Sequence, residues 1–208
     1  MSATTRVGLL GGSFDPIHVG HLHIARQARQ RLNLDRVVFV PAGQPPHKLA
    51  QALTGPEHRF EMVRRAVDGL THFSVSRIDL DRPGPSYSVD TVRLLQERWG
   101  PQTRIYFLIG ADSLADLPKW YHTRQLLDLC QVVAVGRPGY RVDLAALERR
   151  FPGAPPVILL ESVSLVDVSA TRVRQRVAEG RSIEGLVPPA VAAYIAAHGL
   201  YRGAPSPP

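Results

Sequence analysis

The sequence predicts an α/β protein with a mainly parallel sheet and helices on both faces. Three observations lead to this fold class. Short apolar runs of strand length alternate with amphipathic helical patterns from one end of the chain to the other. Gly or Pro follows several of the apolar runs, which is typical of the ends of buried strands. A length of 208 residues with 44% hydrophobic residues suits one globular domain.

The first half of the chain contains three predicted strands and three predicted helices. The strands are apolar runs at residues 6–10, 37–40 and, with weaker alternation, 73–80. The helices have apolar side chains three and four positions apart and lie at residues 18–32, 57–67 and 90–99. Phe60, Val63 and Val67 are expected to face inward from the second helix. Ser88 is expected to cap the third helix.

The second half repeats the alternation. The clearest strand of the chain is RIYFLI at residues 104–109, and weaker strands follow at 131–135 and 157–160. Helices are predicted at residues 124–128, 170–179 and 189–197. Residues 1–202 are expected to form the single domain, and the tail GAPSPP at 203–208 is expected to be disordered.

This order of elements predicts a Rossmann-like, doubly wound sheet. Ligands of such sheets bind beyond the carboxyl ends of the strands, at the point where the strand order reverses. The informative loops are therefore those that follow strands, at residues 11–21, 41–48, 110–112 and 136–140. The connection at residues 42–56 is longer than usual for a compact domain, which favours a functional role.

Composition narrows the class of protein. No apolar run reaches the roughly 18 residues that a membrane span needs, and no signal-peptide pattern is present. The single cysteine, Cys130, cannot form an internal disulfide and is expected to be a buried apolar residue. A cytoplasmic protein without a membrane partner is expected. The net charge of +7 suits a partner rich in phosphate.

The first string that carries chemistry is GGSFDPIHVGH, at residues 11–21. Two glycines after a strand allow a tight turn and a close approach of the backbone to a ligand. His18 and His21 lie three positions apart at the start of a helix, where N–H groups and the helix dipole favour phosphate. Gly20 is expected to leave room for a base or a ribose. No third ligand has the spacing of a zinc site, so no protein-held metal is expected.

The second string is VSATRVR, at residues 168–174. Ser169 can cap a helix whose first N–H groups again suit phosphate. Ser169 and Thr171 add hydroxyl groups, and Arg174 adds a planar charged fork. Taken alone, the string also fits a plain capped basic helix.

Together the two strings resemble the nucleotidyltransferases that carry an HxGH motif. Further segments narrow the resemblance to bacterial nicotinate-nucleotide adenylyltransferases: PPHK at 45–48, SYS at 86–88, IGADS at 109–113, WY at 120–121, RPGY at 137–140 and the stretch from 187 to 201. The resemblance covers residues 6–202. Ser13 stands where Thr is usual in that family, and Ala170 stands where Ser is frequent, so no phosphate contact is assigned to Ala170.

The resemblance implies a reaction and a set of residues. The family joins nicotinate mononucleotide to ATP and releases pyrophosphate, with Mg²⁺ carried by ATP. His18, His21, Lys48 and Arg174 are then the catalytic candidates. The ATP site would comprise Gly11, Gly12, Ser13, Phe14, Gly20, Gly110, Asp112, Ser169 and Thr171. Asp112 could meet the ribose or could instead cap a helix. A monomer or a homodimer is expected.

The resemblance also implies where the acceptor binds. Nicotinate mononucleotide would meet His47, Lys48, Ser86, Tyr87, Ser88, Trp120, Tyr121 and Arg137. Trp120 could stack on the flat pyridine ring, although a core position is the default for a tryptophan. Backbone N–H groups at residues 86–88 would accept the nicotinate carboxylate. Arg137 would add positive charge, or would simply be a solvated arginine at a strand end. Donors at this position predict a preference for the acid over the amide.

Three other functions compete with this one. A sister transferase of the same fold, such as a pantetheine-phosphate adenylyltransferase or a cytidylyltransferase, is disfavoured by length, by PPHK and by the WY pair. A basic nucleic-acid-binding module needs a concentrated Lys/Arg face with interleaved aromatic residues, whereas the arginines here are scattered. A catalytically silent nucleotide sensor is disfavoured because both histidines and Arg174 are present.

Overall fold

The computed structural model describes residues 4–46, 53–136, 143–161 and 168–202. Its strands form one sheet in the order β3-β2-β1-β4-β5-β6, and every neighbouring pair is parallel. The strand order reverses between β1 and β4, as in a doubly wound sheet. The predicted α/β class is confirmed. The strands are β1 (Thr5–Gly12), β2 (Arg36–Pro41), β3 (Phe73–Val75), β4 (Thr103–Gly110), β5 (Gln131–Gly136) and β6 (Ile158–Glu161).

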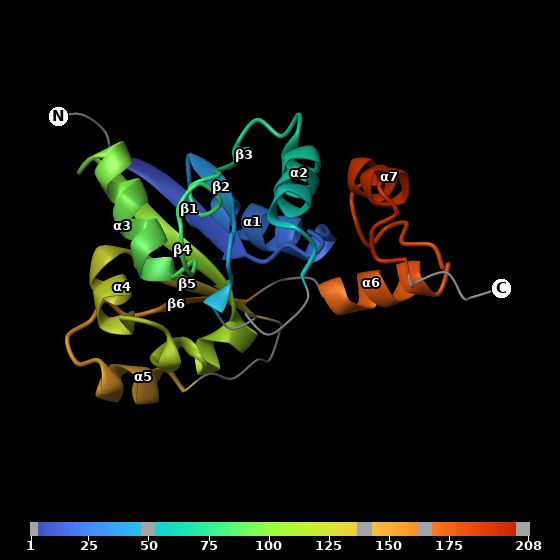
Figure 1. The fold of residues 1–208 in the computed structure, drawn as a ribbon. Helices are drawn as coiled ribbons and strands as arrows, with labels where there is room; N and C mark the ends of the chain where they lie inside the picture. Colours follow the sequence, from blue (N-terminus) through green and yellow to red (C-terminus); the bar gives the residue numbers. More distant parts are fainter. Residues whose placement is uncertain (1–3, 47–52, 137–142, 162–167, 203–208) are drawn as a thin grey trace.

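Helices cover both faces of the sheet (Figure 1). One face carries α1 (Val19–Arg31), α2 (Pro56–Val67), α6 (Ala170–Ala178) and α7 (Pro189–Ala197). The other carries α3 (Ser88–Trp99), α4 (Thr123–Leu129) and α5 (Leu144–Arg150). Two 3₁₀ turns, η2 (Ala111–Ala115) and η3 (Leu117–Lys119), follow β4.

Burial on both faces explains why the central strands are continuously apolar. In β4, Phe107 packs in the cluster under α3 and α4, whereas its neighbours Tyr106 and Leu108 pack in the cluster under α1 and α2. A parallel strand covered on both sides has no polar face, so its sequence does not alternate. Cys130 is buried as expected, and burial raises the pKa of its thiol to about 12.

Several predicted details are wrong. β3 has only three residues, because the chain turns after Ser76, where the Leu80 N–H donates to the carbonyl of Arg77. Ser88 does not cap α3, since Tyr87 is the capping residue and Ser88 is the first residue of the helix. Helix α5 was not predicted. It is short and exposed, and only the Asp143 side chain, which accepts the Ala146 N–H, marks its start.

The inward face of α2 also differs from the prediction. Arg59 is buried, whereas Phe60 is only half-buried and lies under the guanidinium of Arg77, 4.8 Å from its ring centroid. Val63 and Val67 do face the core. Arg59 can be buried because its guanidinium donates hydrogen bonds to the carbonyls of neighbouring loops.

The fold brings the ends of β1, β2 and β4 to one edge of the sheet. Gly12 lies beside Pro41 in the register of β1 and β2, and the Ala42 N–H donates to the carbonyl of Gly12. The loops that the sequence selected after these strands therefore start next to one another. Within the described part of the chain, no helix is long and apolar enough to span a membrane.

Candidate active site

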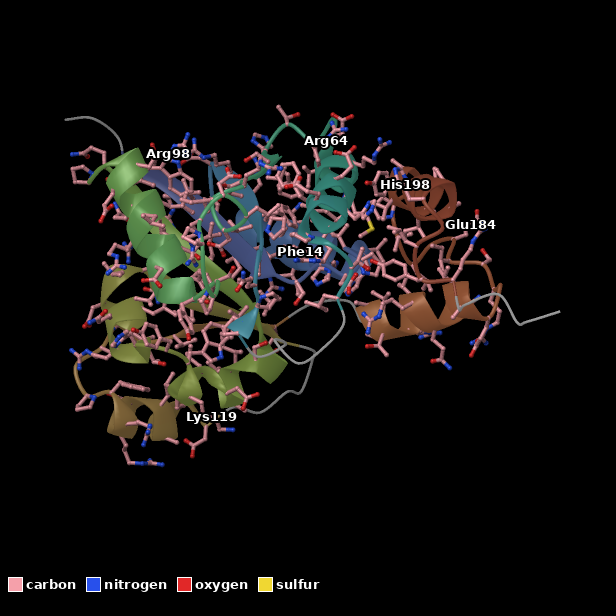
Figure 2. All side chains as sticks on the ribbon, viewed as in Figure 1. Phe14, Arg64, Arg98, Lys119, Glu184 and His198 are labelled. Carbon is pink, nitrogen blue, oxygen red and sulfur yellow. The ribbon has the colours of Figure 1, made fainter. Side chains whose placement is uncertain are left out.

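The loop between β1 and α1 forms the centre of the site. Phe14, which Figure 2 labels, adopts the left-handed conformation, with φ of 48°. Its buried ring and the ring of His21 meet edge to face, with their centroids 5.0 Å apart. A Cβ atom on Gly12 would lie 3.2 Å from that ring. Glycine at this position therefore allows the loop to fold back over the end of β1.

The two histidines form a stacked pair. Their ring centroids are 3.7 Å apart, with an angle of 24° between the planes. Nδ1 of His21 accepts the N–H of His18 at 3.2 Å, and His18 is the capping residue of α1. A neutral imidazole that accepts at Nδ1 carries its proton on Nε2. The backbone thus selects the tautomer of His21 and makes its Nε2 a donor.

His18 lies in a buried position. Burial lowers its pKa to about 4, so the ring is neutral at pH 7. Its Nδ1 atom is buried, and the described residues offer it no hydrogen-bond partner. A Cβ on Gly20 would come within 3.1 Å of this atom and of Val168. The space beside Gly20 is therefore filled by the protein itself rather than left for a base or ribose.

The second string meets the first, although they are far apart in sequence. The Ser169 hydroxyl accepts the N–H of Arg172 at 3.2 Å and caps α6, as predicted. Arg174 donates to the carbonyl of Asp15 at 2.7 Å and to the Thr171 hydroxyl at 3.3 Å. These bonds use two of the five N–H donors of a guanidinium. Arg174 therefore fixes α6 against the loop that leads to His18.

A second group of predicted residues lies near the end of β2 and the start of α3. The Ser86 N–H donates to the carbonyl of Gln44 at 2.8 Å, and the Ser86 hydroxyl accepts the Gln44 N–H at 3.2 Å. The Tyr87 N–H donates to Pro85. Two of the three N–H groups expected to meet a carboxylate thus have partners inside the chain. Ser88 begins α3, where the first N–H groups of a helix have no partner within it.

The predicted aromatic residues gather beside this turn. The Tyr87 and Tyr121 rings are stacked at 4.2 Å, and His122 meets Tyr121 at 3.9 Å. Tyr121 is 49% exposed. Trp120 is half-buried and packs its ring edge-on against Phe107 at 6.2 Å. Trp120 therefore adjoins the core, while the ring of Tyr121 is partly exposed although it stacks on Tyr87.

Comparison with known proteins decides the family. The model of the cytidylyltransferase-like family matches residues 9–176. A relative from Roseiflexus sp. (strain RS-1), named "Probable nicotinate-nucleotide adenylyltransferase", is 48% identical over 94% of this chain and 98% of its own. A relative of the same name from Thermus thermophilus is 48% identical over 95% and 100%. The chain belongs to the nicotinate-nucleotide adenylyltransferases within the cytidylyltransferase-like family.

Solved structures agree on the fold of this family. A Plasmodium falciparum nicotinic acid mononucleotide adenylyltransferase complexed with NaAD superposes with a TM-score of 0.77 and 19% identity, covering 95% of this chain and 97% of that one. At this level of identity, the likeness supports the arrangement of strands and helices.

Some residues that the adenylyltransferase resemblance selected lie beyond the structural description. His47, Lys48 and Arg137 fall outside the described residues, as does the side chain of Asp112. The backbone of Asp112 lies inside η2, which Gly110 caps, so Asp112 is not the capping residue. In the described ranges, no cluster of three or more His, Cys, Asp or Glu side chains could hold a metal ion.

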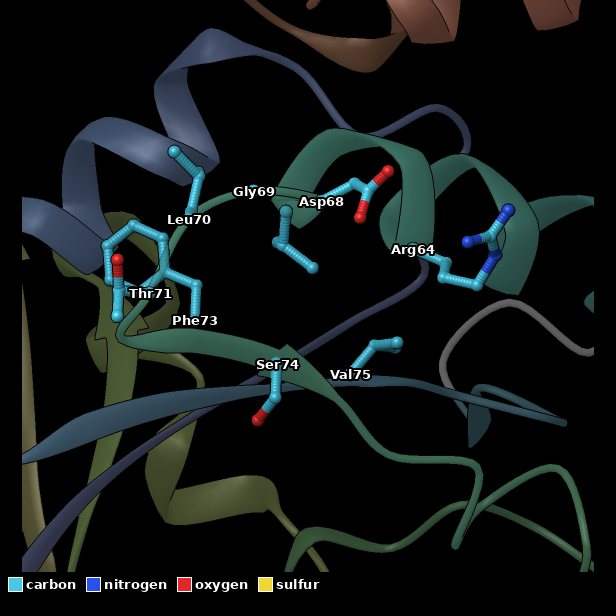
Figure 3. A pocket seen from close by; sticks show the side chains of 9 residues that line it. Arg64, Asp68, Gly69, Leu70, Thr71, Phe73, Ser74 and Val75 are labelled. Atoms are coloured by element: carbon cyan, nitrogen blue, oxygen red, sulfur yellow. The ribbon is translucent and has the colours of Figure 1, made fainter.

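A surface pocket lies elsewhere in the protein. It has a volume of about 400 Å³ and opens between α2 and β3, at the edge of the sheet (Figure 3). Arg64 and Asp68 line it from the helix side, and Phe73 and Val75 line it from the strand. Among the described residues, none that the sequence predicts to bind ATP or the acceptor borders it. The described candidate residues therefore lie apart from this pocket.

Proposed function

We propose that this protein transfers the adenylyl group of ATP to nicotinate mononucleotide, giving nicotinate adenine dinucleotide and pyrophosphate in NAD biosynthesis. The observation that carries the proposal is the stacked pair of His18 and His21 at the start of α1, in a loop that Arg174 holds against α6. Relatives that bear the name of this activity support it along nearly the whole chain.

The chemistry requires positioning more than proton transfer. The 5′-phosphate of the mononucleotide is largely a dianion at pH 7, because the second pKa of a phosphate monoester is about 6. One of its oxygens attacks the α-phosphorus of ATP in line. The bond from that phosphorus to the bridging oxygen breaks, and pyrophosphate leaves with the electron pair. No general base or covalent enzyme intermediate is needed.

The residues of the site would spread the developing charge. His18 and His21 would contact the α- and β-phosphates as uncharged donors, which suits the low pKa of His18 and the tautomer of His21. The N-terminus of α1 adds its dipole. Lys48 would lie near the incoming and leaving phosphates. Arg174, with the hydroxyls of Ser169 and Thr171, would hold the β- and γ-phosphates.

The remaining ATP contacts would come from the strand ends. The backbone of Gly11, Gly12, Ser13 and Phe14 would line the phosphates. Gly20 would leave room for the ring of His18. Gly110 and Asp112 would face adenosine. Mg²⁺ would be held mainly by phosphate oxygens and water, and it would neutralise charge on the leaving group. Both carboxylate oxygens of Asp15 already accept hydrogen bonds, which fits a metal held by ATP rather than by this side chain.

The acceptor would bind across the turn at residues 86–88. Because the N–H groups of Ser86 and Tyr87 are bonded within the chain, the start of α3 at Ser88 is the better candidate for the nicotinate carboxylate. Tyr121 and Trp120 would cover the pyridine ring, with His47, Lys48 and Arg137 adding charge. The amide of nicotinamide mononucleotide would direct its NH₂ group at N–H donors, and two donors cannot bond to each other. Nicotinate mononucleotide should therefore be preferred. Cytoplasmic ATP would supply the adenylyl group.

Pyrophosphate release tests the proposal directly. The protein is incubated with ATP, Mg²⁺ and either nicotinate or nicotinamide mononucleotide, in separate reactions. Release with the nicotinate form alone is expected. Equal catalytic efficiency with both would keep the reaction and overturn the carboxylate site. Release with neither, but with phosphopantetheine, would assign the chain to a sister reaction.

A further inference from the structure

Arg59 is the largest fully buried side chain of the described residues, 1% exposed. It extends from α2 toward the strand ends, where its guanidinium donates to four backbone carbonyls. Its Nε donates to Thr54 at 2.8 Å, its Nη1 to Ser13 at 2.8 Å and to Ala42 at 2.7 Å, and its Nη2 to Gly43 at 3.1 Å. One guanidinium thus binds the loop after β1 and both described ends of the connection between β2 and α2.

The same region holds a buried carboxylate. Asp15 is 3% exposed and accepts the Thr54 N–H at 3.2 Å and the Tyr201 hydroxyl at 2.6 Å. Its own carbonyl accepts Arg174. Burial lowers the pKa of Arg59, and the charge of Asp15 opposes that shift. Four distant segments therefore meet at one polar cluster directly behind the histidine loop.

The bonding pattern differs from what packing alone requires. An apolar side chain of similar size could fill the same volume without the cost of burying a charge. The guanidinium adds fixed directions, because its planar fork allows little variation in the positions of the carbonyls that it binds. Ser13 belongs to the loop that leads to His18, whereas Ala42 and Gly43 follow β2 and adjoin the turn of Ser86 through Gln44. In the proposed function, the first of these loops contacts ATP and the second adjoins the acceptor, so the spacing of the loops affects the spacing of the two substrates.

We propose that Arg59 is a positioning residue that fixes the spacing of the ATP loop (residues 11–18) and the acceptor loop (residues 40–46), and that Tyr201 supports this spacing by holding Asp15. The proposal rests on the proposed adenylyl transfer. In-line attack needs the two phosphates in near contact, and a displacement of about 1 Å can cost roughly 100-fold in rate. Loosening the two loops should therefore lower kcat more than it weakens the binding of ATP.

Two substitutions at Arg59 test this. Arg59→Met keeps a long side chain and removes every donor, while Arg59→Lys keeps the charge and loses the planar fork. At a temperature where circular dichroism shows each variant folded, kcat should fall about 100-fold in Arg59→Met and about tenfold in Arg59→Lys. The dissociation constant of adenosine 5′-(α,β-methylene)triphosphate, measured by calorimetry, should change by no more than about threefold, since Arg59 contacts no phosphate in this proposal.

A matched pair of tyrosines separates position from stability. Tyr201→Phe removes only the hydroxyl that donates to Asp15. Tyr194→Phe makes the same change in α7, where the hydroxyl bonds Nδ1 of His58 at 2.9 Å and lies outside the loops of the site. Tyr201→Phe should lower kcat about tenfold, whereas Tyr194→Phe should leave it within about twofold. Both should lower the melting temperature by a similar amount.

Hydrogen exchange at the backbone amides of residues 11–18 and 40–46 gives a readout that does not depend on turnover. Faster exchange in Arg59→Met and Tyr201→Phe, but not in Tyr194→Phe, would support the inference even if the wild type proved inactive with nicotinate mononucleotide. That inactivity would overturn the proposed function alone. A folded Arg59→Met variant with wild-type kcat, or with unchanged exchange in both loops, would overturn the inference.

Discussion

The candidate active site has a phosphate side, around His18 and Arg174, and a pyridine side, around Tyr87 and Tyr121. The two sides are built in opposite ways. On the phosphate side, Asp15 and His18 are buried, and bonds from α2, α6 and the C-terminal residues hold their loop. On the pyridine side, the half-exposed Tyr121 stacks on Tyr87 at the surface.

The difference matches what phosphate chemistry and acceptor binding each require. Charge that develops on phosphate oxygens is best stabilised by donors that need no rearrangement, which favours a rigid and largely dry loop. Selection of the acceptor can use an open aromatic face, because stacking tolerates small shifts of the ring. Rate should therefore depend on the phosphate side, and the affinity for the mononucleotide should depend on the pyridine side.

The largest effect is expected for His18→Ala. Loss of one donor to the phosphates should lower kcat about 1,000-fold, as for removal of an oxyanion donor. Pyrophosphate release measures the loss, and circular dichroism confirms the fold. His72→Ala, at an exposed histidine away from the site, is the matched control and should keep full activity. An active His18→Ala variant would remove the histidine pair from the mechanism.

A smaller effect is expected on the pH dependence of stability. The unfolded chain binds a proton at His18 near pH 6.5, whereas the folded chain does so only near pH 4. Between these values the unfolded state holds more protons, so the free energy of unfolding decreases as the pH falls from 6.5 to 4. The decrease from this group should reach about 3 kcal/mol.

Urea unfolding at several pH values measures this decrease. His18→Gln should remove the part of the slope that His18 causes, and His72→Gln should retain it. A wild-type slope in His18→Gln would mean that the folded protein accommodates a charged His18. The phosphate side would then be solvated, as the pyridine side is, and the contrast between the two sides would be smaller.

The sequence predicts best what local signals specify. The run RIYFLI is a strand because both faces of β4 are covered, and Ser169 caps α6 because a hydroxyl before a helix satisfies an open N–H. The two strings around His18 and Arg174 also meet in space as the resemblance implied. These features depend on a few neighbouring residues or on a long motif.

The sequence could not reveal features that depend on distant partners. Arg59 stands beside Phe60, and hydrophobicity alone assigns the inward position to the aromatic residue. The arginine is buried only because carbonyls from three separate segments converge on it. Tyr201 reaches Asp15 across 186 positions. The only signal in the sequence was the spacing of Arg59, which lies three positions before Met62 and four positions before Val63. This spacing puts it on the same face of the helix as those two apolar residues.

The smallest expected effect tests the pyridine side. Tyr121→Ala removes the partly exposed ring that stacks on Tyr87. The KM for nicotinate mononucleotide should rise about tenfold, which corresponds to the energy of one aromatic stacking contact. The KM for ATP and kcat should stay close to the wild type, and Tyr121→Phe should restore the acceptor KM because it keeps the ring. If instead kcat fell with an unchanged KM, the aromatic side would act in the transition state, and the division between rate and affinity would be wrong.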